Sequence, residues 1–298
     1  MRTLLLSVLI VMPITASAAD HSAGEVGTDT ATVIEIPSDI FGFTSAADTG
    51  AMRDQGLALE NDFLLGARKG RYQQFTQKLE YSFAFKENWA IAASVFGAYH
   101  NIKNVPTIPQ NVTAYRFDGL SFEVRHRFIE RTATQPFAVT FAIEPRWSRL
   151  DGDGFGVRSE LVGVEMKLQA DAPITPQLFW AVNANFASAG QQNLTTNRWT
   201  SFSGTTLSTA LAYSLLEGKA FVGAEVRWVQ EYSNTIFGKR SRYALFLGPT
   251  FQAKVADNIS VLLTIQPQIA GKVAGLQANL DLQPLDRALA RFGIALGF

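Results

Sequence analysis

The sequence contains no cysteine, so no disulfide contributes to the stability of the folded chain. Lysine plus arginine balance aspartate plus glutamate at 26 each, and this zero net charge does not favour bulk attraction to nucleic acid. Beyond residue 19, no apolar run approaches the roughly 18 residues that a membrane helix needs. Apolar residues nevertheless make up 47% of the chain, so another arrangement must bury or shield them.

The first residues have the pattern of a secretory signal peptide. Arg2 precedes an apolar run from Leu4 to Ile14, and the small residues Ala16–Ala18 then fit the A-x-A cleavage pattern. The run is too short and wrongly flanked for a membrane helix, and a buried N-terminal helix is the alternative. We therefore predict a cleaved signal peptide over residues 1–19.

The remaining chain alternates apolar with polar or small residues, which is the period-two pattern of a β-strand with one apolar face. Within residues 75–85, Leu79 and Tyr81 fall on one face, and Lys78 and Glu80 fall on the other. Most such segments span about ten residues or more, which matches a tilted membrane strand rather than a globular one. The predicted strands are 55–66, 75–85, 89–99, 120–128, 137–147, 157–170, 177–188, 204–215, 220–232, 241–254, 259–270 and 287–298.

Short and long connections alternate between these strands. The connections at 86–88 and 216–219 are short, whereas those at 189–203 and 271–286 are longer. Short periplasmic turns and longer external loops are typical of outer-membrane barrels. We predict an all-β, antiparallel up-and-down transmembrane barrel of about 12 strands over residues 51–298. The even strand number places both ends of the barrel sequence on the periplasmic side.

Large aromatic residues mark both ends of the predicted outer face. Trp89 and Phe128 lie toward the short turns, Trp147 and Trp228 lie toward the long loops, and aliphatic residues fill the space between. Aromatic rings prefer the headgroup level of a bilayer, so two aromatic rims around an aliphatic belt indicate a membrane barrel. A soluble barrel or sandwich, which is the alternative, has no reason to produce this arrangement.

The end of the sequence resembles the C-terminal assembly signal of bacterial outer-membrane β-barrels, the superfamily that includes porins and transporters. The positions that carry the resemblance are Arg291, Gly293, Leu296 and Phe298. The whole pattern is also similar to uncharacterised proteobacterial barrels. The resemblance implies location in the outer membrane of a Gram-negative cell and a partnership with the barrel assembly machinery and outer-membrane lipids.

Charged residues at inward positions are the candidates for a selectivity surface in the lumen, and among them arginine and lysine outnumber glutamate. One interpretation is a set of cross-strand ion pairs that satisfy one another, and the other is a path for an anionic solute. The candidate lumen residues are Glu123, Arg125, Arg127, Glu144, Arg146, Glu165, Lys167, Glu225, Arg227 and Arg242.

Enzymatic and metal sites are not favoured, and we expect no catalytic residue, no cofactor and no metal. His100 lies at the predicted external rim, where barrel lipid hydrolases keep their base, yet Ser94 is about 20 Å away along the strand. The run Asp151–Gly154 lacks the rest of a calcium loop.

Two further stretches carry distinctive charge. Basic clusters at the predicted external face match lipopolysaccharide phosphates, although ordinary loop solubility explains them equally well. Residues 20–50 contain no lysine or arginine and predict a flexible periplasmic segment; the alternatives are an added strand or folding into the arginine-rich lumen. The candidate lipopolysaccharide-binding residues are Arg68, Lys69, Arg71, Lys239 and Arg240.

The function that this sequence favours is a narrow, porin-like channel for passive transport of small polar or anionic solutes. A non-conducting structural or lipopolysaccharide-binding barrel is the alternative from another class. A lipid hydrolase of the outer membrane is a third. The solute itself is not encoded in any motif.

Overall fold

The computed structural model describes residues 34, 36–37, 39–66, 69–106, 108, 110–151, 156–194, 196–275, 279–280, 282 and 286–298, so the predicted signal peptide lies outside the described residues. Twelve strands in these ranges form one closed antiparallel barrel, which confirms the predicted fold class. Within the same ranges, no helix is long and apolar enough to cross a membrane. The strands are β1 (Gln55–Leu65), β2 (Arg71–Lys86), β3 (Trp89–Lys103), β4 (Val112–Ile129), β5 (Ala138–Leu150), β6 (Arg158–Pro173), β7 (Leu178–Asn193), β8 (Arg198–Leu215), β9 (Ala220–Ser233), β10 (Arg240–Ala256), β11 (Ile259–Val273) and β12 (Ala288–Gly297).

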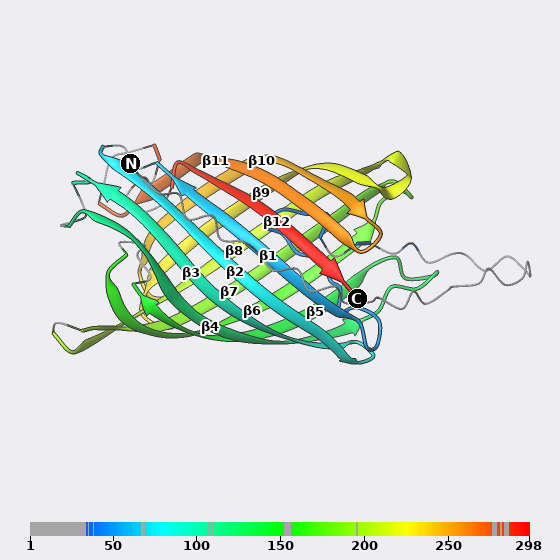
Figure 1. Cartoon of the computed structure of the whole chain (residues 1–298), viewed down its shortest axis with the longest axis horizontal. Coiled ribbons are helices and arrows are strands. Elements are labelled where there is room, and N and C mark those ends of the chain that lie inside the picture. The colour runs from blue at the N-terminus through cyan, green and yellow to red at the C-terminus, as the bar shows by residue number, and fades with distance from the viewer. Residues whose placement is uncertain are drawn as a thin grey trace, which may run out of the picture.

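The barrel closes where β12 lies beside β1, drawn in red and blue in Figure 1, and all strands run obliquely to the long axis. The register runs without a shift from Gly56 opposite Gly297 to Leu65 opposite Ala288. Beyond it, Gln55 and Phe298 exchange two backbone hydrogen bonds of 3.0 Å each. Closure satisfies the backbone donors and acceptors that an open edge would expose to lipid.

The outer wall carries the apolar face that the alternation predicts. Phe85 and Phe128 are exposed toward the short-turn end, and Trp228 is exposed toward the long-loop end. Trp89 and His126 stack at the short-turn end with a distance of 4.1 Å between ring centroids. A wall of exposed apolar side chains is suited to hydrocarbon, because there is no protein outside it to cover them.

Residues 39–50, which we call the inner segment, lie inside the barrel and not in the periplasm. The part of the expected flexible segment that the structure describes is thus ordered, and the alternative of folding into the lumen holds for it. Ile40 and Phe41 are buried together with Ile36 against Phe179 and Phe221 of the inner wall. These apolar contacts stabilise the segment in a lumen that is otherwise polar.

Polar contacts with the wall hold the inner segment in register. The amide of Phe43 donates to Glu225 over 2.8 Å, and the amide of Ala47 donates to Asp171 over 2.7 Å. Thr44 donates to Ser208 over 2.9 Å. A Cβ at Gly42 would meet a Glu225 oxygen at 2.6 Å and the Thr264 methyl at 2.9 Å, so the approach here requires glycine.

The absence of cysteine allows a direct test of orientation. We expect Asn193→Cys, at the end of β7 where the chain turns at the long-loop end, to react with a membrane-impermeant maleimide on intact cells. Asn258→Cys, in the short β10–β11 turn, should react only after the outer membrane is permeabilised. Labelling of Asn258→Cys alone on intact cells would reverse the proposed orientation.

Candidate transport pathway in the lumen

A cavity of about 640 Å³ occupies the lumen between the inner segment and the long-loop end. Phe43 and Ser45 of the inner segment border the cavity on one side. Tyr72, His100 and Asp286 border it near the long loops. The cavity is therefore a polar chamber whose inner limit is the inner segment itself.

One wall of the lumen holds a charged network centred on Lys167 of β6. Its ammonium group pairs with Glu123 at 2.7 Å, with Glu144, and with Glu165 at 4.0 Å. Arg125 donates to Glu123 over 3.0 Å from Nε and so extends the network along β4. Charges inside a closed sheet are stable only when they are paired or wet, and these five are paired.

A second network surrounds Arg291 of β12. Its guanidinium donates to both oxygens of Asp62, over 2.7 and 2.9 Å, and lies 3.3 Å from Glu60. It also donates to the carbonyl of Gly42 over 3.4 Å. A bidentate arginine–carboxylate pair fixes both partners in one geometry, so Arg291 links the barrel seam to the inner segment.

Two more lining arginines pair across neighbouring strands. Arg146 of β5 donates to Asp118 of β4 over 2.6 Å, and Arg242 of β10 pairs with Glu231 of β9. In both cases the carboxylate comes from the adjacent strand, and Arg146 takes it although Glu144 lies two positions away on the same strand. Cross-strand neighbours on one face are the closest side chains in a sheet, which explains this choice of partner.

Arg227 differs from the other lining cations, because it forms no ion pair within 4 Å among the described residues. Its guanidinium lies 4.6 Å from the ring centroid of Phe43, and the guanidinium of Arg291 lies 4.5 Å from the same centroid. Two cations on one ring hold Phe43 in place. The neighbouring Glu225 accepts hydrogen bonds from Gln266 over 2.6 Å and from the amide of Phe43 in the inner segment, so it does not pair with Arg227.

Carboxyl groups outnumber cations in the cavity lining, so the expected excess of positive charge is wrong for this space. Sequence reasoning missed Glu60, Asp62, Asp118 and Glu231. Glu60, Asp62 and Glu231 continue the period-two pattern beyond the clearest runs, whereas Asp118 breaks the pattern of β4, because the register shifts between Phe117 and Gly119. Burial raises the pKa of Asp286, in the β11–β12 connection, to about 8, so this group is largely protonated at neutral pH. The lining charges are Glu60, Asp62, Asp118, Glu144, Asp151, Glu165, Glu231 and Asp286 against Lys78, Arg146, Lys167, Arg227, Arg242 and Arg291.

The remaining lumen candidates lie deeper. Arg127 pairs with Asp48 of the inner segment at 3.5 Å, and Arg125 donates to the Asp48 carbonyl over 3.1 Å. The structure thus splits the ten predicted lumen residues into two groups. Glu144, Arg146, Glu165, Lys167, Arg227 and Arg242 line the cavity, whereas the others lie behind it or hold the inner segment.

His100 lies toward the long-loop end of β3, as expected, but its side chain is buried and faces the lumen. Ser94 donates to Glu80 over 3.1 Å, and the neighbouring Asn101 donates to Gln73 over 3.1 Å, so neither side chain is bonded to the imidazole. This arrangement does not assemble a nucleophile with a base. The candidate calcium run lies mostly outside the described residues, which include only Asp151 of it.

The two basic clusters do not come together. Lys69 and Arg71 lie at the start of β2, and Lys239 and Arg240 lie at the start of β10, with β11, β12 and β1 between them. Arg68 lies outside the described residues. Any lipid contact must therefore be made by each cluster separately.

The residues that carry the assembly resemblance fall on both faces of β12. Arg291 points into the lumen and Gly293 is buried, while Phe298 is 63% exposed next to the seam. Leu296 pairs with Leu57 across the seam. The terminal ring thus lies at the short-turn rim, as the alternation predicts.

A closed antiparallel barrel with an apolar outer belt and a charged lumen defines an outer-membrane β-barrel protein, located in the outer membrane. Residues 37–298 match a family model described as "Family of unknown function (DUF6662)", and the chain belongs to this family. No curated protein matches the sequence.

Solved structures share the fold. The chain is similar to the COG4313 outer membrane channel from Pseudomonas putida F1, with a TM-score of 0.55 and 7% identity over 92% of this chain and 100% of the other. It is similar to the β domain of the Bordetella autotransporter BrkA, with a TM-score of 0.52 and 12% identity over 83% and 100% of the two chains. It is also similar to the NanC porin, with a TM-score of 0.50 and 10% identity over 80% and 98%. At these identities the likeness establishes the fold.

Proposed function

We propose that the protein is a narrow channel for the passive passage of small polar solutes across the outer membrane. The observation that carries the proposal is the chamber of about 640 Å³, which lies inside a closed barrel and is lined by charged and amide side chains. A purely structural barrel is stable with a filled interior, whereas a polar chamber in contact with the inner segment is suited to the passage of hydrated solutes.

The inner segment sets the bore in this proposal. It occupies the short-turn half of the lumen and is held there by side-chain contacts to β4, β6, β9 and β12. Solutes must pass beside the inner segment, or they can pass only after it moves. We therefore expect a conductance well below that of a wide porin, whose open aqueous channel is formed by about sixteen to eighteen strands.

A local preference for anions beside Phe43 rests on Arg227. With Asp286 largely neutral at pH 7, seven lining carboxylates face six cations, but Arg227 is the lining cation without an ion pair within 4 Å among the described residues, so its charge remains for a passing solute. Low-dielectric walls focus the field of such a charge along the lumen.

Arg227→Glu is expected to shift the reversal potential in a salt gradient toward cation preference. The change inverts the lining cation that has no ion pair within 4 Å among the described residues, and the measurement is made on purified barrel in planar bilayers. Arg240→Glu is the matched control, because it makes the same change on the outer wall and should leave the reversal potential as in wild type. A reversal potential that Arg227→Glu leaves unchanged would contradict the role given to Arg227.

The non-conducting alternative predicts a different result in the same bilayers. Protein with verified insertion and no current steps would favour a structural or lipid-binding barrel. The hydrolase alternative receives no support from the geometry around His100, and an ester substrate incubated with the purified barrel tests it directly. Release of fatty acid that is lost in His100→Ala would establish it.

A further inference from the structure

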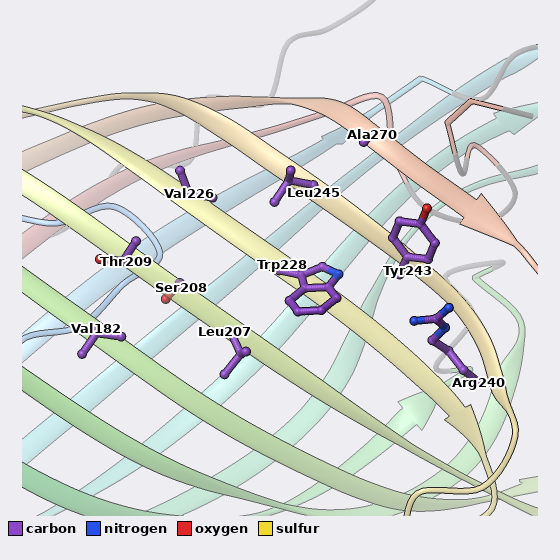
Figure 2. Close-up of a pocket in the computed structure, with 10 residues that line it drawn as sticks. All are labelled: Val182, Leu207, Ser208, Thr209, Val226, Trp228, Arg240, Tyr243, Leu245 and Ala270. Carbon is purple, nitrogen blue, oxygen red and sulfur yellow. The ribbon is translucent and has the colours of Figure 1, made fainter.

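The outer wall carries a groove of about 670 Å³ across β7 to β11 near the long-loop end. Figure 2 shows Trp228 at its centre, with Leu207 on one neighbouring strand and Leu245 on the other. Arg240 is the one charged residue among the ten that line it. The full lining is Val182, Leu207, Ser208, Thr209, Val226, Trp228, Arg240, Tyr243, Leu245 and Ala270.

A β-bulge directs Arg240 to the outer wall. Arg240 pairs with Tyr232, but Arg242 pairs with Glu231, so Ser241 is an extra residue at this point of the ladder. Without the extra residue, Arg240 would point into the lumen on the same face as Arg242. Bulges re-aim side chains in this way, and here the result is a cation above an apolar groove.

Arg240 is held in place without a carboxylate partner among the described residues. Its guanidinium lies 5.1 Å from the ring centroid of Tyr243, beside which Figure 2 shows it, and it donates to Gln230 over 3.4 Å. A guanidinium that makes only these contacts retains donors for an anion, and its planar fork suits phosphate.

The β9–β10 connection packs on the outer wall next to the groove. Phe237 lies 5.1 Å from Phe186 and 5.6 Å from Tyr232 between ring centroids, so the connection rests on the outer wall. Tyr232 is the register partner of Arg240. These ring contacts fix the rim next to the cation before any ligand arrives, which lowers the entropic cost of binding.

We propose that this groove binds lipopolysaccharide, with one acyl chain along Leu207, Trp228 and Leu245 and a phosphate on Arg240. The groove faces the hydrocarbon, so its occupant must be a lipid or another protein. The position of Arg240 at the long-loop end places the cation at the level of the outer leaflet, where the lipid phosphates are those of lipopolysaccharide. The inference is independent of whether the lumen conducts.

A second copy of this chain fits the groove less well. A two-fold dimer would bury the same patch from both protomers and would bring the two Arg240 cations toward one desolvated surface. An anionic lipid instead supplies the missing negative charge together with an apolar chain. Charge complementarity therefore favours the lipid.

The test uses purified, folded barrel in detergent and measures binding of lipopolysaccharide by native mass spectrometry. We expect Arg240→Gln to weaken binding about tenfold, which corresponds to about 1.4 kcal/mol. Lys239→Gln removes the same charge from the adjacent position, which does not line the groove, and should change the affinity less than threefold. Val226→Trp should weaken binding with Arg240 intact, because the larger ring occupies the acyl path.

Dephosphorylated lipopolysaccharide completes a double-mutant cycle. The wild-type barrel should bind the dephosphorylated lipid more weakly than the intact lipid. Arg240→Gln should bind both lipids with the same affinity, because the phosphate and the guanidinium form one interaction. Equal affinity of Arg240→Gln and wild type for the intact lipid would overturn the proposal. So would a dimer of the wild-type barrel that Val226→Trp dissociates, since a second copy would then be the occupant. Retained heat modifiability of each variant verifies that it is folded.

Discussion

A barrel that lacks residues 37–50 is expected to conduct several times more current per channel than the full chain, with the same signal peptide in both. Those residues include the inner segment, which fills the short-turn half of the lumen and packs Ile40 and Phe41 against Phe179 and Phe221. Their removal leaves a twelve-stranded lumen lined by side chains alone, and its bore lies between a filled eight-stranded barrel and a wide porin. Single-channel recording in planar bilayers measures the change.

A single substitution provides a milder version of the same experiment. Gly42→Val places a branched side chain where Glu225 and Thr264 already stand within 3 Å, so the inner segment must shift. Gly297→Ala is the matched control, because no atom lies within 4 Å of the added Cβ. We expect unstable, partly enlarged conductance from Gly42→Val and wild-type current from the control. Unchanged current in both the deletion and Gly42→Val would show that the inner segment does not limit the bore.

A chain that ends at Gly297 is expected to yield at least about tenfold less folded barrel in the outer membrane. The truncation removes two backbone hydrogen bonds between Gln55 and Phe298, each worth about 1 kcal/mol, and an aromatic anchor at the lipid rim. It also removes the terminal aromatic that resembles the assembly signal. Heat-modifiable protein in isolated outer membranes, measured on gels without boiling, gives the folded amount.

Two further variants separate the ring from the backbone at this position. Phe298→Tyr keeps an aromatic ring and both hydrogen bonds and should assemble normally. Phe298→Ala keeps the hydrogen bonds and loses the ring, so we expect a level between the truncated chain and the wild type. Wild-type levels of the truncated chain would mean that the terminal resemblance has no role in assembly.

The strands and the outer face were predictable because a bilayer imposes one simple rule on every strand. Each outward side chain meets lipid, so alternation persists through β2, β4 and β9, and even the uneven stretch at Gln55–Leu65 is identifiable as β1. The inner face follows no such rule. Which partner a charge takes depends on the adjacent strand, as when Arg146 pairs with Asp118 although Glu144 is closer in sequence.

For the inner segment, charge was the only property in the sequence that pointed to its location. A stretch without lysine or arginine is suited to a lumen that contains Arg125, Arg127 and Arg291, and this signal supported one of the alternatives. Its burial was not predictable, because residues 39–50 have no strand period and their partners lie far along the chain. Phe43, for example, bonds a residue 182 positions away. The bulge at Ser241 could not be predicted for a related reason, because an extra residue is recognised only when the register with the partner strand is known.

The order of these contacts along the chain has a consequence for folding. The inner segment precedes every strand in the sequence, yet its partners lie on β4, β6, β9 and β12. Its hydrogen bond from Arg291 can form only when the last strand is present. The strand that seals the wall against β1 thus also completes the contacts of the segment that occupies the lumen.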